Sequence, residues 1–115
     1  MTIQHFFSLA NVNRERSAAG KLYREFLRVP AMSAGLYVLK AGAEDPQKPH
    51  NEDELYYVVR GRARMRVGSG EKMEEQSIQG GSIIFVEAQV EHRFFDITKD
   101  LEVLVFFAPA EYSNK

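Results

Sequence analysis

The chain has 115 residues, of which 15 are basic and 16 acidic, and its formal net charge is −1. This length suits one domain with a single hydrophobic core. The nearly neutral charge, without a long run of like-charged residues, argues against binding to nucleic acid or to an anionic membrane. Because cysteine is absent, disulfides, thiolate nucleophiles and cysteine-ligated zinc are excluded, and any metal must be bound by nitrogen and oxygen atoms.

The N-terminal residues 1–7 lack the basic start and the long apolar stretch of a secretory signal. No stretch approaches the roughly 18 apolar residues that a membrane-spanning helix requires. Together with the absence of cysteine, this pattern predicts a cytoplasmic protein.

In chain order, short segments of alternating hydrophobic and polar residues dominate, and turn residues separate them. Residues 13–19 have a weak helical pattern that Gly20 ends, so we expect at most a short turn of helix there. The predicted strands are residues 21–29, 32–40, 55–60, 62–67, 73–78, 82–86, 93–97 and 101–107. So many short strands predict an all-β sandwich or barrel. The last residues, 111–115, are expected to fray.

Three polar side chains stand beside strand-like segments, where an imidazole or carboxylate is hard to bury without a partner: His50, Glu54 and His92. In an extended chain the Cα atoms of residues 50 and 54 would be about 13 Å apart, too far for both side chains to bind one ion at about 2 Å. We therefore expect a turn at residues 51–53, whose polar side chains suit one. The three side chains then form a candidate metal site.

The pattern around His50 resembles the first motif of the cupin superfamily. That motif reads glycine, a spacer, His-x-His, three or four residues, glutamate, six residues and glycine. Here three residues separate His50 from Glu54, and six separate Glu54 from Gly61. Lys48 occupies the place of the first histidine. The resemblance implies that His50 and Glu54 are metal ligands.

Residues 81–96 resemble the second cupin motif, which reads glycine, five residues, Pro-x-Gly, two residues, histidine, three residues and asparagine. The histidine of this motif falls on His92. Glu87 and Gln89 stand where the motif has proline and glycine, and Asp96 stands where it has asparagine. The chain is thus similar to a small single-domain bacterial cupin of the cupin 2 type.

This resemblance implies one all-β domain over residues 1–115. Its fold would be a double-stranded β-helix, or jelly-roll barrel, at about residues 32–109, after an N-terminal extension of residues 1–31. It also implies one divalent transition metal, Fe, Mn, Ni or Zn, with the ligands His50, Glu54 and His92. Two histidines and one carboxylate leave coordination positions open for water, substrate or dioxygen.

Lys48 bears on this metal site, because an ammonium group beside the ion would repel it. Its side chain therefore points away, or its pKa shifts, or metal binding is weakened. Gln47 or Glu52 could supply a fourth oxygen ligand. We expect Gln47 and Lys48 at the pocket, with Tyr56 and Phe94 as its aromatic walls.

Alternate residues from Arg62 to Arg66 are arginine, so three guanidinium groups share one face of the strand. They form either an anion-binding stripe or a solvated face that pairs with glutamates across the hairpin. Glu54 and Arg62 are both even-numbered, so in one regular strand they would face the same side. The turn at Gly61 must therefore change whether even- or odd-numbered residues point inward.

Residues 101–107 are apolar on both faces of the predicted strand, and a strand buried on both sides needs a second covering surface. We therefore expect a homodimer that packs through its sheets, as many cupins do.

The barrel would bind a small molecule, as a metal-dependent enzyme of the oxygenase or isomerase type or as a non-catalytic binding or sensing cupin. A structural barrel with a vestigial pocket is the third possibility.

Overall fold

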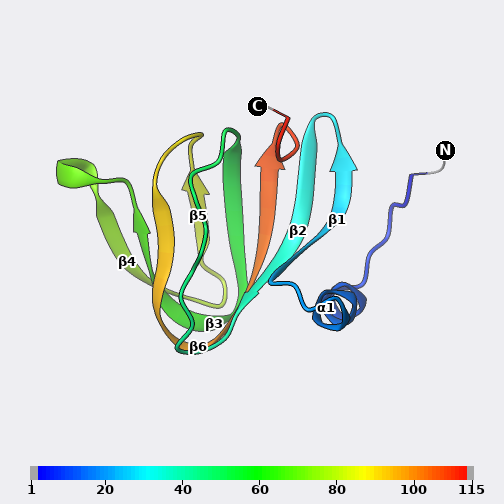
Figure 1. Cartoon of the computed structure of the whole chain (residues 1–115), viewed down its shortest axis with the longest axis horizontal. Helices are drawn as coiled ribbons and strands as arrows, with labels where there is room; N and C mark the ends of the chain where they lie inside the picture. The colour runs from blue at the N-terminus through cyan, green and yellow to red at the C-terminus, as the bar shows by residue number, and fades with distance from the viewer. Residues whose placement is uncertain (1–2, 114–115) are drawn as a thin grey trace.

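The computed structural model describes residues 3–113 and consists of one curled antiparallel sheet and one helix (Figure 1). The elements are α1 (Leu9–Ala18), β1 (Tyr23–Val29), β2 (Met32–Leu39), β3 (Asp53–Val67), the 3-10 turn η1 (Gly70–Lys72), β4 (Glu74–Gln79), β5 (Ile83–Val86) and β6 (His92–Ala108). The strand order is β1-β2-β6-β3-β4, and β5 pairs with β3. In Figure 1 the long strands β3 and β6 bend at the bottom and contribute to both arms of an open barrel. The predicted all-β barrel is confirmed.

Each of these long strands joins two of the predicted segments, and Gly61 marks the bend in β3. Its φ of +109° lies in a region that side chains rarely adopt, and an added Cβ would lie 2.4 Å from the Asp100 carbonyl oxygen. The pairing of β3 with β6 shifts register on both sides of this residue. Before the bend Tyr56 and Val58 are buried, and after it Ala63 and Met65 are buried. The predicted change of parity is therefore confirmed.

The helix is longer than the sequence predicted. Helix α1 covers 10 residues, and the Ser8 side chain caps it by accepting a hydrogen bond from the Asn11 backbone N–H at 3.3 Å. Val12 is the only helical residue that is buried, so hydrophobic periodicity gave little sign of the first turn. The expectation of at most a short turn at residues 13–19 was wrong.

The core lies between the two arms of the curled sheet. Its side chains come from alternate positions of β2, β3 and β6, together with single residues of β4 and β5. The largest of them are fully buried and include Tyr56, Phe94, Leu39 and Leu101. Within residues 3–113, no helix is long and apolar enough to cross a membrane.

At residues 110 and 111 the C-terminal segment packs against the rest of the fold, which was not expected. Glu111 is buried, and Ala110 N–H donates to the Pro30 carbonyl at 3.4 Å. The prediction that the tail frays was therefore wrong for Glu111. Residues 114 and 115 lie outside the described residues.

Candidate metal centre

Three parts of the chain bring the predicted ligands together. His50 lies in the segment before β3, Glu54 is near the start of β3, and His92 is the first residue of β6. The chain bends at residues 51 and 52, as the spacing required. One ligand atom from each side chain lies within 4.8 Å of the others, so the three residues form a group that could hold a metal ion.

The atoms of this group converge on one carboxylate oxygen. His50 Nδ1 lies 2.8 Å and His92 Nε2 lies 3.4 Å from Glu54 Oε1. The side chains of Glu54 and His92 are 1% and 0% exposed, so water does not solvate them. Among the described residues, neither nitrogen has a partner with sound hydrogen-bond geometry. Two ligands that bind a shared ion at about 2 Å and at right angles are about 3 Å apart, close to both distances to Glu54 Oε1, so the group could hold a transition metal.

Neighbouring groups orient two of the three candidate ligands. His92 Nδ1 lies 2.9 Å from the Val90 carbonyl oxygen and donates to it, which leaves the Nε2 lone pair pointing into the site. The Tyr56 hydroxyl contacts Glu54 Oε2. Burial and the Glu54 charge raise the pKa of Tyr56 well above its usual value, so this hydroxyl remains a donor.

A buried aspartate, Asp45, supports this arrangement from the segment between β2 and β3. It accepts hydrogen bonds from the Tyr37 hydroxyl at 2.6 Å, from Gln47 Nε2 at 2.9 Å and from the Phe94 backbone N–H at 2.9 Å. Gln47 Oε1 in turn lies 2.9 Å from the Tyr56 hydroxyl. The sequence analysis missed Asp45, because one aspartate beside a proline is typical of any loop.

A second carboxylate faces the far side of His50. Glu111 Oε2 lies 3.0 Å from His50 Nε2, and the Glu111 side chain is 8% exposed. Burial lowers the pKa of His50, but the nearby carboxylates of Glu111 and Glu54 outweigh it and raise the pKa from 6.5 to about 10. Sequence reasoning missed Glu111 as well, since nothing in the tail indicated burial.

The predicted pocket residues divide into two groups. Tyr56 and Phe94 are fully buried with ring centroids 5.4 Å apart, and the Tyr56 ring centroid lies 6.0 Å from that of His92. Gln47 and Lys48 instead line a pocket of about 360 Å³ that borders His92. Lys48 is exposed, which favours the alternative that its side chain points away from the metal site.

Gln47 and Glu52, the suggested fourth ligands, have other contacts. The Gln47 oxygen faces Tyr56, and Glu52 Oε1 accepts a hydrogen bond from the Tyr112 backbone N–H at 3.1 Å. Glu52 does not belong to the group of possible ligands. Phe107 is a wall that the sequence analysis did not single out, with its ring centroid 4.9 Å from that of His50.

The arginine face of β3 turns out to be largely paired. Arg66 Nε lies 2.7 Å from Glu75 Oε2 on β4, and Arg64 donates to Ser77 at 3.0 Å. Arg66 also lies over the Phe95 ring at 4.9 Å. This pattern supports the solvated face with cross-hairpin pairs rather than an anion-binding stripe.

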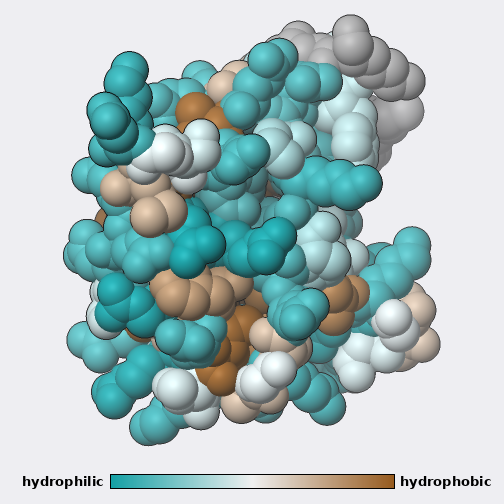
Figure 2. All heavy atoms as spheres, turned by 60° about the vertical axis from the view of Figure 1, so that its left-hand side comes forward, coloured by the Kyte–Doolittle hydropathy of each residue, from teal (hydrophilic) through white to brown (hydrophobic). Residues whose placement is uncertain are grey.

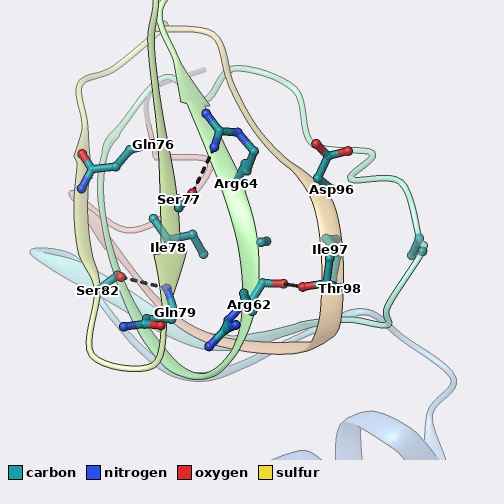
Figure 3. A pocket seen from close by; sticks show the side chains of 13 residues that line it. Arg62, Arg64, Gln76, Ser77, Ile78, Gln79, Ser82, Asp96, Ile97 and Thr98 are labelled. Carbon is teal, nitrogen blue, oxygen red and sulfur yellow. Dashed lines mark hydrogen bonds between the residues drawn. The ribbon is translucent and has the colours of Figure 1, made fainter.

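A larger hollow of about 1160 Å³ lies beside these arginines, and none of the three ligands lines it (Figure 3). Polar side chains of β3 and β4 surround it, and Thr98 Oγ1 lies 3.4 Å from the Arg62 carbonyl oxygen. Figure 2 turns the side of β4 forward and shows a mostly hydrophilic surface with small hydrophobic patches. The buried ligand group, not this open hollow, is the candidate site.

Comparison with known proteins agrees with the barrel fold. The family model for the cupin domain matches residues 35–107. An uncharacterised protein of Streptomyces coelicolor is 48% identical over 105 residues, which are 91% of this chain and 96% of that protein.

Solved structures show the same fold. An RmlC-like cupin with a double-stranded β-helix fold from Methanocaldococcus jannaschii has a TM-score of 0.70 at 20% identity, over 95% of this chain and 94% of that one. KdgF from Halomonas sp. has a TM-score of 0.66 at 19% identity, over 76% of each chain. A structure of Fe(II)-HppE with the alternative substrate (S)-1-HPP has a TM-score of 0.62 at 20% identity, and covers 74% of this chain. This chain matches only 48% of HppE. On its family match, its relative and its fold, the chain belongs to the cupin family.

Proposed function

We propose that the protein is a metal-dependent enzyme acting on a small organic molecule, of the oxygenase or isomerase type. One observation carries this proposal. Two buried imidazole nitrogens, His50 Nδ1 and His92 Nε2, converge on Glu54 Oε1 without a sound hydrogen bond among the described residues. Buried polar atoms are normally satisfied, so such a cluster indicates an ion that shares them.

A divalent ion bound there would polarise an oxygen atom of the substrate or activate dioxygen. The chain's own residues supply the remaining functions. His92 is held in one tautomer by Val90, and Tyr56 donates to Glu54. The rings of Phe94 and Phe107 exclude water from the ligands, which strengthens electrostatic interactions in the site.

The pocket beside His92 is the proposed place for the substrate. Three cationic side chains line it, against one carboxylate: Lys48, Arg66 and Arg93, with Glu91. Arg66 is already paired with Glu75, whereas Lys48 and Arg93 are exposed. This balance favours a substrate that carries a negative charge.

Elemental analysis of the purified protein tests the metal site. We expect about one transition metal per chain after reconstitution with Fe(II), Mn(II), Ni(II) or Zn(II), and loss of that metal in His50→Ala and in His92→Ala. His5→Ala is the matched control, because His5 is exposed. Absence of metal in the reconstituted protein contradicts the proposal. Turnover of small carboxylates and of other small anions, measured with each metal, then tests for enzyme activity.

A non-catalytic binding or sensing cupin is the second candidate. The observation that favours it is the ligand set itself, with an exposed lysine, Lys48, where the cupin motif has a further histidine. Stoichiometric metal and saturable ligand binding, without turnover under any metal, would support this candidate over the enzyme.

We also propose that the protein forms a homodimer through an outer apolar face. Leu55 pairs with Phe85 and Phe106, and Tyr57 pairs with Ile83 and Leu104, so these side chains form one patch on β5, β3 and β6. Ile83 and Phe85 are 68% and 56% exposed. An exposed patch on three adjacent strands favours packing against the same face of a second copy.

Light scattering coupled to gel filtration tests the dimer. We expect a mass near twice the 13.1 kDa of one chain, and a shift toward the monomer in Phe85→Lys because a charge would be buried in the interface. Met73→Lys is the control, since Met73 is similarly exposed but lies outside the patch. A wild-type mass of one chain at micromolar concentration would exclude the dimer.

A further inference from the structure

We infer that Glu111 is a positioning residue of the metal site, which holds the His50 ring so that its Nδ1 atom faces Glu54 and His92. The inference rests on the proposed metal site and adds a residue from the C-terminal segment, far from both cupin motifs. It also gives a function to a part of the chain that composition alone marks as a polar tail.

The two nitrogens of His50 face two different carboxylates. Nδ1 lies 2.8 Å from Glu54 Oε1, and Nε2 lies 3.0 Å from Glu111 Oε2. A neutral imidazole has one N–H and one lone pair, so an Nε2–H that donates to Glu111 leaves the Nδ1 lone pair for a metal. A carboxylate behind a metal-binding histidine fixes the tautomer and ring orientation and makes the ligand more basic.

Glu111 is itself held by contacts from separate parts of the fold. Its backbone N–H donates to Ser33 Oγ of β2 at 2.9 Å, and its carbonyl accepts from Arg28 Nη2 of β1 at 2.7 Å. The next residue, Tyr112, donates its N–H to Glu52 Oε1 at 3.1 Å. β1, β2 and the segment beside His50 therefore all hold the backbone that carries the Glu111 carboxylate, independently of any metal.

His50 depends on a partner distant in sequence to fix the orientation of its ring, whereas His92 does not. His92 begins β6 and has the Val90 carbonyl as its partner, two residues away along the chain. His50 lies outside the strands, in the segment before β3, and its side chain is 15% exposed against 0% for His92. A ligand on a loop gains most from an external partner that limits its rotamers.

The test compares Zn(II) affinity in the full chain and three variants by competition with a chelator, at several pH values between 6.5 and 9. The affinities are corrected for the proton that the metal displaces from His50. We expect Glu111→Ala to weaken the corrected affinity by about 10- to 100-fold. Glu111→Gln should weaken it less, because its amide oxygen still accepts from Nε2–H. Glu102→Gln is the matched control, since Glu102 is also buried but pairs with Arg60.

A readout of ring orientation separates positioning from stability. In the zinc-loaded protein labelled with ¹⁵N, we expect His50 Nδ1 to be the ligand atom and Nε2 to carry a hydrogen-bonded proton, whose signal shifts in Glu111→Gln. If Glu111→Ala does not fold, Ser33→Ala takes its place. This variant keeps the Glu111 carboxylate but removes the acceptor of the Glu111 backbone N–H, so we expect a smaller loss of zinc affinity.

Two results would overturn the inference. If the wild type binds zinc and both Glu111 variants bind it equally well with unchanged His50 signals, the carboxylate does not position the ligand, although the metal site stands. If the wild type binds no metal at all, the proposed function fails together with this inference.

Discussion

Replacing Asp45 by alanine is expected to lower the free energy of unfolding by about 3–5 kcal/mol, since each buried donor left unsatisfied costs about 1–3 kcal/mol. Its carboxylate accepts hydrogen bonds from Tyr37, Gln47 and Phe94, and Tyr37 and Phe94 are buried. Burial and the hydrogen bond to Asp45 raise the pKa of Tyr37, so its hydroxyl stays a donor and loses its acceptor in the variant. Urea denaturation of the metal-free protein measures the effect.

Asp53→Ala is the control for this experiment. Asp53 also accepts a backbone hydrogen bond, from Ala88 N–H at 2.9 Å, but it is exposed. Water can replace an exposed partner, so we expect a loss of about 1 kcal/mol or less. Equal losses in the two variants would show that Asp45 is not the buried anchor of this loop. Asp45→Ala should in addition weaken metal binding, because Gln47 and Tyr56 lose their support next to Glu54.

Metal affinity is expected to rise steeply with pH. In the metal-free protein, burial lowers the pKa of His50 but the carboxylates of Glu111 and Glu54 raise it to about 10. Below that pH a metal must displace a proton from His50, so the affinity should increase about tenfold per pH unit, or about 100-fold between pH 6.5 and 8.5. Zinc titrations against a chelator of known pH dependence measure this slope. If zinc affinity does not change between pH 6.5 and 8.5, metal binding displaces no proton from His50, and the prediction is wrong.

The same proton stabilises the metal-free fold. Since the pKa of His50 is higher in the folded chain than the ordinary 6.5, its contribution is complete below about pH 6.5 and is lost as the pH rises toward 10. In the presence of a chelator, the unfolding temperature of the wild type should fall over this range relative to that of His50→Gln. Parallel curves for the two proteins would argue against the contribution.

Much of the barrel was predictable because period-2 patterning is a local property of the chain. The change of parity at Gly61 was also predictable, because Glu54 and Arg62 are both even-numbered and could not otherwise face opposite sides. Two kinds of error remain. The segments 55–60 and 62–67 are one strand, because backbone pairing with β6 continues through the bend. The first turn of α1 rests on the Ser8 cap and has no clear apolar face.

The group of possible metal ligands was predictable in part, because motif spacing is also a local property of the chain. His50, Glu54 and His92 have a recognisable spacing, and the structure brings their ligand atoms within 4.8 Å of one another. The residues that orient these side chains were not predictable. Asp45 and Glu111 reach the site from segments far away along the chain. No local pattern distinguishes a buried loop carboxylate from an exposed one.

The sequence by itself determined the strand pattern, the absence of thiol chemistry and the three side chains that can share an ion, because alternation and residue type are properties of short segments. Only the tertiary structure decided that the C-terminal segment folds back onto His50, that Lys48 stays exposed, and that the Phe107 ring packs beside His50. Those outcomes depend on the curl of the sheet, which sets distances between residues that the chain keeps far apart.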